Sequence, residues 1–192
     1  MIELIEAFIL LLVIMNPILS LGALLSMSEG KSEKEKKAIA VKSVLVAAFV
    51  FFLFAFAGNI ALDILGTKID SFRAAGGIIL ILLGIQMSLG IRILKEKEEV
   101  SETAVVIGTP LISGPATITT TILLVNDTGL GITLAAGTIA LIVILFTLLI
   151  SSKLGKIVGH SGMRVLSTMM GIVTISWGIQ FLLEGAMKFI GA

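Results

Sequence analysis

Several residue types are scarce or absent in this chain of 192 residues. It contains no cysteine, which excludes disulfide bonds and metal sites built from thiolates. Charged residues make up only 14% of the chain, whereas they form roughly a quarter of a soluble globular domain. The net charge of +1 gives no sign of a nucleic-acid partner. What is present is apolar: 57% of the residues are hydrophobic and the mean hydropathy is +1.14, so the chain is predicted to be an integral membrane protein.

Proline is also scarce, and no proline is placed in a predicted loop. The three prolines are Pro17, Pro110 and Pro115, and all of them lie inside apolar stretches. A proline inside a helix removes one backbone donor and clashes with the preceding turn. We therefore expect one helix to be broken at Asn16-Pro17 and another at Gly114-Pro115, each near the middle of its span.

Six apolar segments are long enough to cross a bilayer, which takes about 20 residues per helix. No length remains for a separate soluble domain. The loops between the segments are short and polar; a tight turn is expected over residues 126–129, and a loop is expected around Lys153, Lys156 and His160. The six predicted spans are residues 2–27, 38–62, 72–94, 103–125, 130–152 and 163–188.

Basic residues give the expected orientation. If both termini are extracytoplasmic, the cytoplasmic loops hold eleven of the 14 basic residues and the other side holds Lys68, Arg73 and Lys188. This bias follows the positive-inside rule, so a cell-membrane protein with both ends outside is predicted. The eleven are Lys31, Lys34, Lys36, Lys37, Lys42, Arg92, Lys95, Lys97, Lys153, Lys156 and Arg164.

The third and sixth predicted spans resemble each other. Residues 77–86 read GIILILLGIQ and residues 171–180 read GIVTISWGIQ, which are identical at six of ten positions. Gln86 and Gln180 are the only glutamines in the chain. We therefore expect two repeats, residues 1–98 and 99–192, of three spans each. An odd number of spans gives the repeats opposite orientations, as in the inverted repeats of secondary transporters.

The two expected breaks predict a cavity between the repeats, because unsatisfied backbone is tolerated at membrane depth only where protein, water or ligand completes it. Each break exposes the positive N-terminal end of one half-helix and the negative C-terminal end of another. A carboxylate suits the first and an ammonium or sodium ion suits the second. The candidate substrate-binding residues are Asn16, Pro17, Ser20, Gly22, Thr109, Ser113, Gly114, Pro115, Thr117 and Thr120.

These side chains are small, polar and uncharged, which favours a small, net-neutral cargo such as glycine, alanine or serine. A sodium ion could bind near Asn16, Ser113 and Thr117. Coupling to a proton is the other option, through carboxylates near span ends such as Asp63 or Glu184. The spans place no carboxylate or histidine in their middle thirds, so an intramembrane enzyme is not expected, and no cofactor is expected. An exporter or channel for another small polar solute or drug is the alternative function.

Three features resemble the MarC-type family of membrane proteins. They are the Asn-Pro of the first span, the Ser-Gly-Pro-Ala with its following threonines in the fourth, and the six-span layout over the whole chain. That family includes transporters of small neutral amino acids. The resemblance implies cation-coupled movement of such amino acids, with the two discontinuous spans forming the site.

Overall fold

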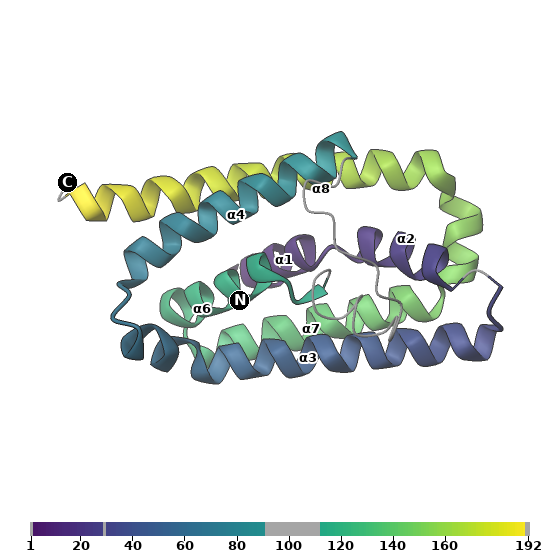
Figure 1. Cartoon of the computed structure of the whole chain (residues 1–192), viewed down its shortest axis with the longest axis horizontal. Helices are drawn as coiled ribbons and strands as arrows, with labels where there is room; N and C mark the ends of the chain where they lie inside the picture. Colours follow the sequence, from purple (N-terminus) through teal and green to yellow (C-terminus); the bar gives the residue numbers. More distant parts are fainter. Residues whose placement is uncertain (1, 29, 91–111, 191–192) are drawn as a thin grey trace.

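The computed structural model describes residues 2–28, 30–90 and 112–190 (Figure 1). Over these residues the chain forms helices and no strand, so the all-helical prediction is confirmed. The helices are α1 (Ile2–Met15), α2 (Pro17–Met27), α3 (Glu33–Ile64), α4 (Ile69–Leu89), α6 (Pro115–Thr128), α7 (Leu130–Leu149) and α8 (Ser151–Ile190).

Five segments are helical, long and apolar enough to cross a membrane, and each corresponds to one predicted span. They are Ile2–Leu25, Glu33–Ile64, Ile69–Leu89, Leu130–Leu149 and Ser161–Met187. The predicted fourth span begins outside the described residues, and its described part contains α6, which has 14 residues. A sixth span therefore stays a prediction.

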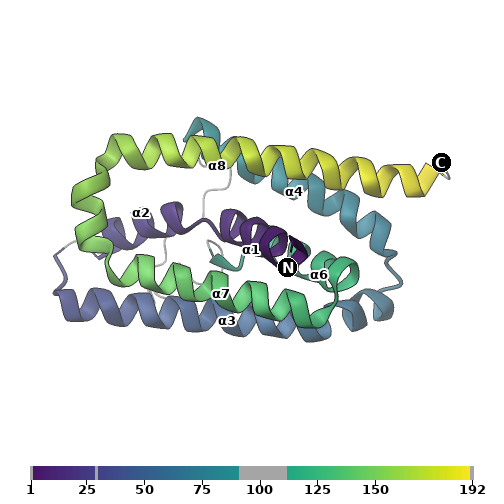
Figure 2. The ribbon, with the colours of Figure 1, turned by 180° about the vertical axis from the view of Figure 1, so that it is seen from behind.

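The helices form three tiers, which Figure 1 shows from one side and Figure 2 from behind. Helices α3 and α7 lie side by side in one outer tier, and α4 and α8 form the opposite one. Helices α1, α2 and α6 lie between them, and α1 contacts both α7 and α8. In the most apolar window of Ile2–Leu25, 56% of the residues are buried, against 22–39% in the other four spans. The first span is thus the centre of the fold.

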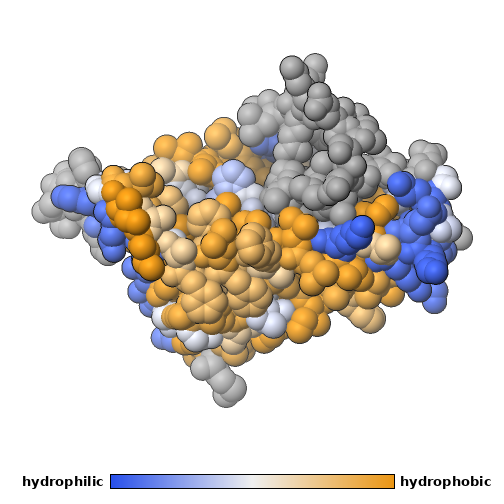
Figure 3. Space-filling model, turned by 60° about the horizontal axis from the view of Figure 1, so that its bottom comes forward, coloured by the Kyte–Doolittle hydropathy of each residue, from blue (hydrophilic) through white to orange (hydrophobic). Residues whose placement is uncertain are grey.

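Helix α3 shows how the surface suits lipid. Its outward side chains are large and apolar and recur every three or four residues: Leu45, Phe49, Leu53, Phe56 and Ile60. Its buried face carries mainly small residues, among them Ala40, Ala47, Ala55 and Gly58, with Phe51 as the largest exception. A membrane helix typically places large apolar residues toward the lipid and small residues toward neighbouring helices. Figure 3 shows the result as a broad apolar belt, with hydrophilic residues gathered toward the two ends of this face.

Helices α4 and α8 make the most extensive contact, and they run antiparallel (Figure 1). Their glycines permit it: a Cβ atom on Gly77 would lie 2.5 Å from the carbonyl oxygen of Gly178, and one on Gly84 would lie 2.6 Å from that of Gly171. Gly185 approaches the backbone of Asp70 in the same way. The glycine faces of α4 and α8 therefore meet each other.

Two helix boundaries differ from the sequence-based expectation. Residues 126–128 were expected in a turn but continue α6, because Asn126 and Thr128 each bond back to a carbonyl one turn earlier, and only Gly129 turns the chain. The segment expected as a loop around Lys153 is the start of α8, which bends at Gly159 with φ 62° and ψ 174°. Both segments were predicted as loops because they contain polar residues. A helix can include polar residues where it extends beyond the hydrocarbon core.

Candidate functional site

The first helical span is interrupted at Asn16. Helix α1 ends at Met15, α2 begins at Pro17, and Asn16 between them has the left-handed conformation φ 48°, ψ 75°. It is the one non-glycine residue with positive φ in the described part of the chain. Asparagine tolerates this conformation better than most residues. Its Oδ1 accepts from the Leu19 amide at 3.0 Å and so caps α2, while the missing donor of Pro17 falls at the first helical position.

A second irregular segment, residues 112–114, precedes α6. Pro115 is the first residue of α6, and Gly114 provides no side-chain cap for it. The Ser113 hydroxyl donates to the carbonyl of Ala47 on α3 at 2.8 Å. The Thr117 hydroxyl donates to the carbonyl of Ile112 at the same distance. Two side-chain hydrogen bonds thus hold the irregular backbone in place ahead of an uncapped helix N-terminus.

The interruption at Asn16 and the irregular segment before Pro115 lie at the same level of the molecule. Helix α1 packs against α6, and residues near the start of α1 line the same cavity as residues near the end of α6, so the two helices run antiparallel. Met15 lies about 18 Å along α1 from Glu3, and Pro115 lies about 18 Å along α6 from Asp127, at 1.5 Å per residue. The buried neighbours of both segments, including Met15 and Ile112, belong to one continuous apolar core.

Three buried polar groups near these interruptions make no hydrogen bond to any described residue. They are Nδ2 of Asn16, Oγ of Ser20 and Oγ1 of Thr120. The exposed fractions of these residues are 1%, 0% and 0%. Leaving a buried polar group unpaired costs roughly 1–3 kcal/mol, so such groups are rare in proteins and mark places where a ligand or water can bind.

The remaining polar groups divide into donors and acceptors. Because Ser113 and Thr117 give their hydroxyl hydrogens to backbone carbonyls, their oxygen lone pairs are left as acceptors. Asn16 is the reverse: its Oδ1 already accepts from Leu19, and its amide NH₂ is left as a donor. The site can therefore bind a ligand that both donates and accepts, without any formal charge of its own.

The predicted site residues fall into two groups on the structure. Asn16, Pro17, Ser20 and Gly22 lie at the first interruption and along α2. Ser113, Gly114, Pro115, Thr117 and Thr120 lie at the second and along α6. A Cβ atom on Gly22 would meet nothing within 4 Å, so this glycine borders open space. Thr109 lies outside the described residues.

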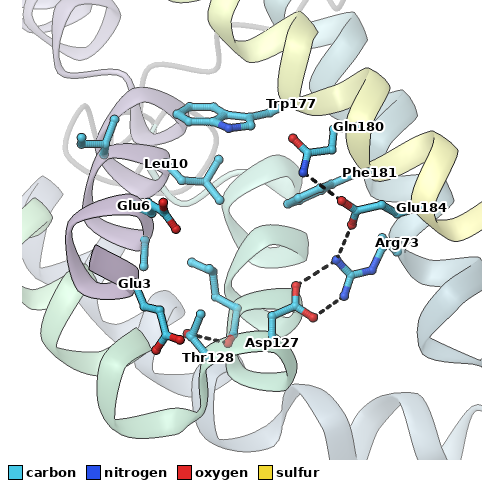
Figure 4. A pocket seen from close by; sticks show the side chains of 13 residues that line it. Glu3, Glu6, Leu10, Arg73, Asp127, Thr128, Trp177, Gln180, Phe181 and Glu184 are labelled. Carbon is cyan, nitrogen blue, oxygen red and sulfur yellow. Dashed lines mark hydrogen bonds and ion pairs between the residues drawn. The ribbon is translucent and has the colours of Figure 1, made fainter. Parts of the chain in front are cut away.

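Sequence reasoning missed a second polar cluster, centred on Arg73 of α4 (Figure 4). Only 6% of Arg73 is exposed, although it had been counted as a loop-side charge. Its guanidinium bonds both carboxylate oxygens of Asp127 and, at 3.1 Å, Glu184. The partners are 54 and 111 residues away in the sequence, so no local pattern could reveal them. The position of an arginine close to the start of a span was the one available signal.

Metal binding was considered for both clusters. Across the described ranges, no group of three or more His, Cys, Asp and Glu side chains is placed to hold a metal ion. A sodium ion held by carbonyl and hydroxyl oxygens near Asn16, Ser113 and Thr117 needs no such group, and that site stays a prediction.

Comparison with known proteins gives a consistent result. The model of the family described as "MarC family integral membrane protein" matches residues 1–190. The UPF0056 membrane protein PH0760 of Pyrococcus horikoshii is 30% identical over 100% of both chains. The UPF0056 membrane protein MJ1677 of Methanocaldococcus jannaschii is 29% identical over 93% of each chain, and one from Aquifex aeolicus is 27% identical over 97% of this chain and 93% of its own. No solved structure matches.

Proposed function

Since this chain belongs to the MarC family of integral membrane proteins, we propose that it is a secondary transporter that moves small neutral amino acids across the cell membrane by alternating access. Glycine, alanine and serine are the substrates that fit best. One observation carries the proposal: a buried, uncharged set of unpaired polar groups, on Asn16, Ser20 and Thr120, lies near the interruption at Asn16 and the irregular segment before α6.

The chemistry of these groups matches an α-amino acid. Its carboxylate can accept from the Asn16 amide and from the uncapped N-terminus of α6, whose backbone N–H groups and dipole favour an anion. Its ammonium group can donate to the unpaired hydroxyl oxygens of Ser20 and Thr120, which leaves the oxygen atoms of Ser113 and Thr117 for a coupling ion. No residue from 12 to 24 or from 112 to 124 is charged, so a charged substrate side chain would have no partner. The open space beside Gly22 leaves room for a substrate side chain.

The contact between α4 and α8 supports two inverted repeats, residues 1–98 and 99–192. Gly77 and Gly84 match Gly171 and Gly178 in sequence, and in space Gly77 meets Gly178 while Gly84 meets Gly171. A two-fold axis between the helices exchanges one contact for the other, as in any self-complementary contact. The same axis would relate the Asn16 interruption to the one before Pro115 and would give six spans in all. Such repeats commonly rock about a central site near the bilayer midplane.

Orientation and coupling complete the proposal. The distribution of basic residues favours extracytoplasmic termini. Uptake is coupled to a sodium or a proton gradient. Oxygen atoms of Asn16, Ser113 and Thr117 are the expected sodium ligands, because hydroxyl and carbonyl oxygens suit a hard cation. Asp63 and Glu184 are the carboxylates available if the ion is a proton.

The test is uptake of radiolabelled glycine and alanine into proteoliposomes that contain the purified protein, with a sodium gradient, a proton gradient or neither. We expect saturable uptake that follows one gradient and that falls at least about tenfold in Asn16→Ala, since the variant loses the donor amide. Asn59→Ala is the matched control, because it removes an asparagine amide that bonds Asn126 on the exposed surface.

Failure of glycine and alanine uptake under every gradient, with folded protein, would rule out the amino-acid substrate. Uptake that does not saturate and follows no gradient would identify a channel instead.

A further inference from the structure

A cavity of about 470 Å³ lies at the end of the molecule where α1 begins (Figure 4). Glu3 and Glu6 of α1 line one side of it and are exposed. The side chains of Asp127 and Glu184 on the other side are 40% and 37% exposed. The rim of the cavity is therefore polar and reached by solvent, and we call it the outer cavity.

The inner wall of the outer cavity is apolar. It includes Leu10, Leu124 and Phe181, whose exposed fractions are 8%, 6% and 7%. Thr120 lies one helical turn further along α6 from Leu124, a step of about 6 Å. Asn16 lies six residues beyond Leu10, a rise of about 9 Å. One apolar layer thus separates the outer cavity from the proposed binding site.

The cluster of Arg73 lines the outer cavity beside this layer. Its Nη1 donates to Oδ2 of Asp127 at 2.8 Å, and Nη2 bonds the other carboxylate oxygen. Nη1 also bonds Glu184, which accepts from Gln180 Nε2 at 2.8 Å. The guanidinium lies over the ring of Phe181, 5.7 Å from its centroid. Charge-assisted, two-point pairs of this kind are among the stronger hydrogen bonds in proteins.

The two carboxylates join Arg73 to different parts of the molecule. Glu184 is on α8, which already packs closely against α4 through glycines, so this bond lies within one rigid pair. Asp127 is on α6, which begins after the irregular segment 112–114, so this bond connects the rigid pair to the proposed binding site. If α6 moves away from α4, Arg73 keeps Glu184 and is not left as an uncompensated buried charge.

We propose that the Arg73 and Asp127 pair is the latch of the outer gate. While the pair is formed, Leu10, Leu124 and Phe181 shut the path between the outer cavity and the polar groups of Asn16, Ser20 and Thr120. Separation of the pair opens that path on the side where α1 begins. The inference rests on the proposed function, because a gate of this kind belongs to alternating access.

The absence of cysteine allows a direct test with single cysteines. Ser20→Cys places a thiol at the buried site, and Ser20 loses no hydrogen bond because its hydroxyl has no partner among the described residues. Its reaction with a membrane-impermeant methanethiosulfonate reagent is timed in right-side-out and inside-out vesicles. Glu3→Cys, measured separately, marks the side that carries the outer cavity.

Three backgrounds are compared for Ser20→Cys. Asp127→Ala removes the latch, and labelling from the Glu3 side should become at least about tenfold faster, as expected for a shift in population of the open state. Asp127→Glu keeps a carboxylate at a side chain that is 40% exposed and should label as slowly as the parent. Glu6→Gln removes a charge from the same cavity without touching Arg73 and should also label slowly.

Equal labelling rates in the Asp127→Ala and parent backgrounds, or faster labelling in all three, would overturn the latch. Thr120→Cys repeats the measurement from α6 if Ser20→Cys does not fold. Glycine uptake by the unsubstituted protein separates the two proposals, because Ser20→Cys and Thr120→Cys alter the proposed binding site itself. Faster labelling without amino-acid transport keeps the latch and removes the substrate, whereas transport with an unchanged labelling rate keeps the substrate and removes the latch.

Discussion

The pair of α4 and α8 and the interrupted helices at the centre of the molecule bury their residues in opposite ways. The pair brings backbone against backbone at Gly77, Gly84 and Gly178. The centre has an interrupted helix, small polar side chains and three of the five buried polar groups that no described residue satisfies; the other two, Nε of Arg73 and Oγ of Ser88, lie on α4. Close packing gives a rigid body with one arrangement, and unpaired polar groups give a place that a ligand can complete. The comparison suggests which part moves as a unit and which part binds.

The largest effect on stability is expected in the rigid pair. In Gly77→Ala, the new methyl group would lie 2.5 Å from two backbone atoms of α8, so the helices must separate. We expect a loss of about 2 kcal/mol in the free energy of unfolding, as for other overpacked interiors. Gly131→Ala on α7 is the matched control, since its methyl group meets nothing within 4 Å. Thermal unfolding in detergent measures both, and equal midpoints would contradict the close contact.

The next effect separates the two tasks of Asn16. Asn16→Gly keeps access to the left-handed conformation but removes the cap on Leu19 and the donor amide. Asn16→Ala removes these as well and adds backbone strain of roughly 1–2 kcal/mol. Both variants should lose uptake to the same extent, while Asn16→Ala unfolds at a lower temperature. Full uptake in Asn16→Gly would show that the amide does not contact the substrate.

Two adjacent threonines should respond in opposite ways. The Thr121 hydroxyl donates to the carbonyl of Thr117 at 2.7 Å, whereas that of Thr120 has no partner among the described residues. Thr121→Val should lower stability by about 1 kcal/mol and leave the KM for uptake unchanged. Thr120→Val should leave stability unchanged or raise it, and should raise the KM. Unfolding midpoints and uptake kinetics are measured for both variants. Normal transport by Thr120→Val would reject the proposed binding site.

The smallest effect concerns Gly22, a glycine that borders open space and touches no neighbouring helix closely. Gly22→Ala should change stability by less than about 1 kcal/mol, in the direction of stabilisation, because alanine favours the helix. Its methyl group should reduce serine uptake a few-fold relative to glycine uptake, a modest effect typical of one added carbon. An unchanged serine-to-glycine ratio would place the substrate elsewhere.

Local features made much of the fold predictable. Helical spans follow from long apolar runs, and five of them were found with boundaries within a few residues, except where polar residues continued a helix. Pro17 indicated where the helix of the first span is interrupted. The residue with the unusual conformation is Asn16, however, and Pro17 begins the next helix. The repeated glycines at 77, 84, 171 and 178 indicated close packing without naming the partner.

The candidate site was predictable in its residue types but not in its bonding. Ser113 and Thr117 were recognisable as small polar residues near a proline. Their role as acceptors depends on Ala47 and Ile112, whose carbonyls take their hydrogens. The hydroxyl of Thr120 is left unpaired while the hydroxyl of Thr121 is paired. This difference is likewise a result of packing around α6.

By itself, the sequence determined that this protein is helical and lies in a membrane, because hydropathy is a property of each segment and needs no partner. It also determined the family, through motifs that are local. Only the tertiary structure decided that Arg73 is buried and meets Asp127 and Glu184. Such pairing depends on which helices pack together, and a charge buried at a helix interface is stable only when its partner arrives there from another helix.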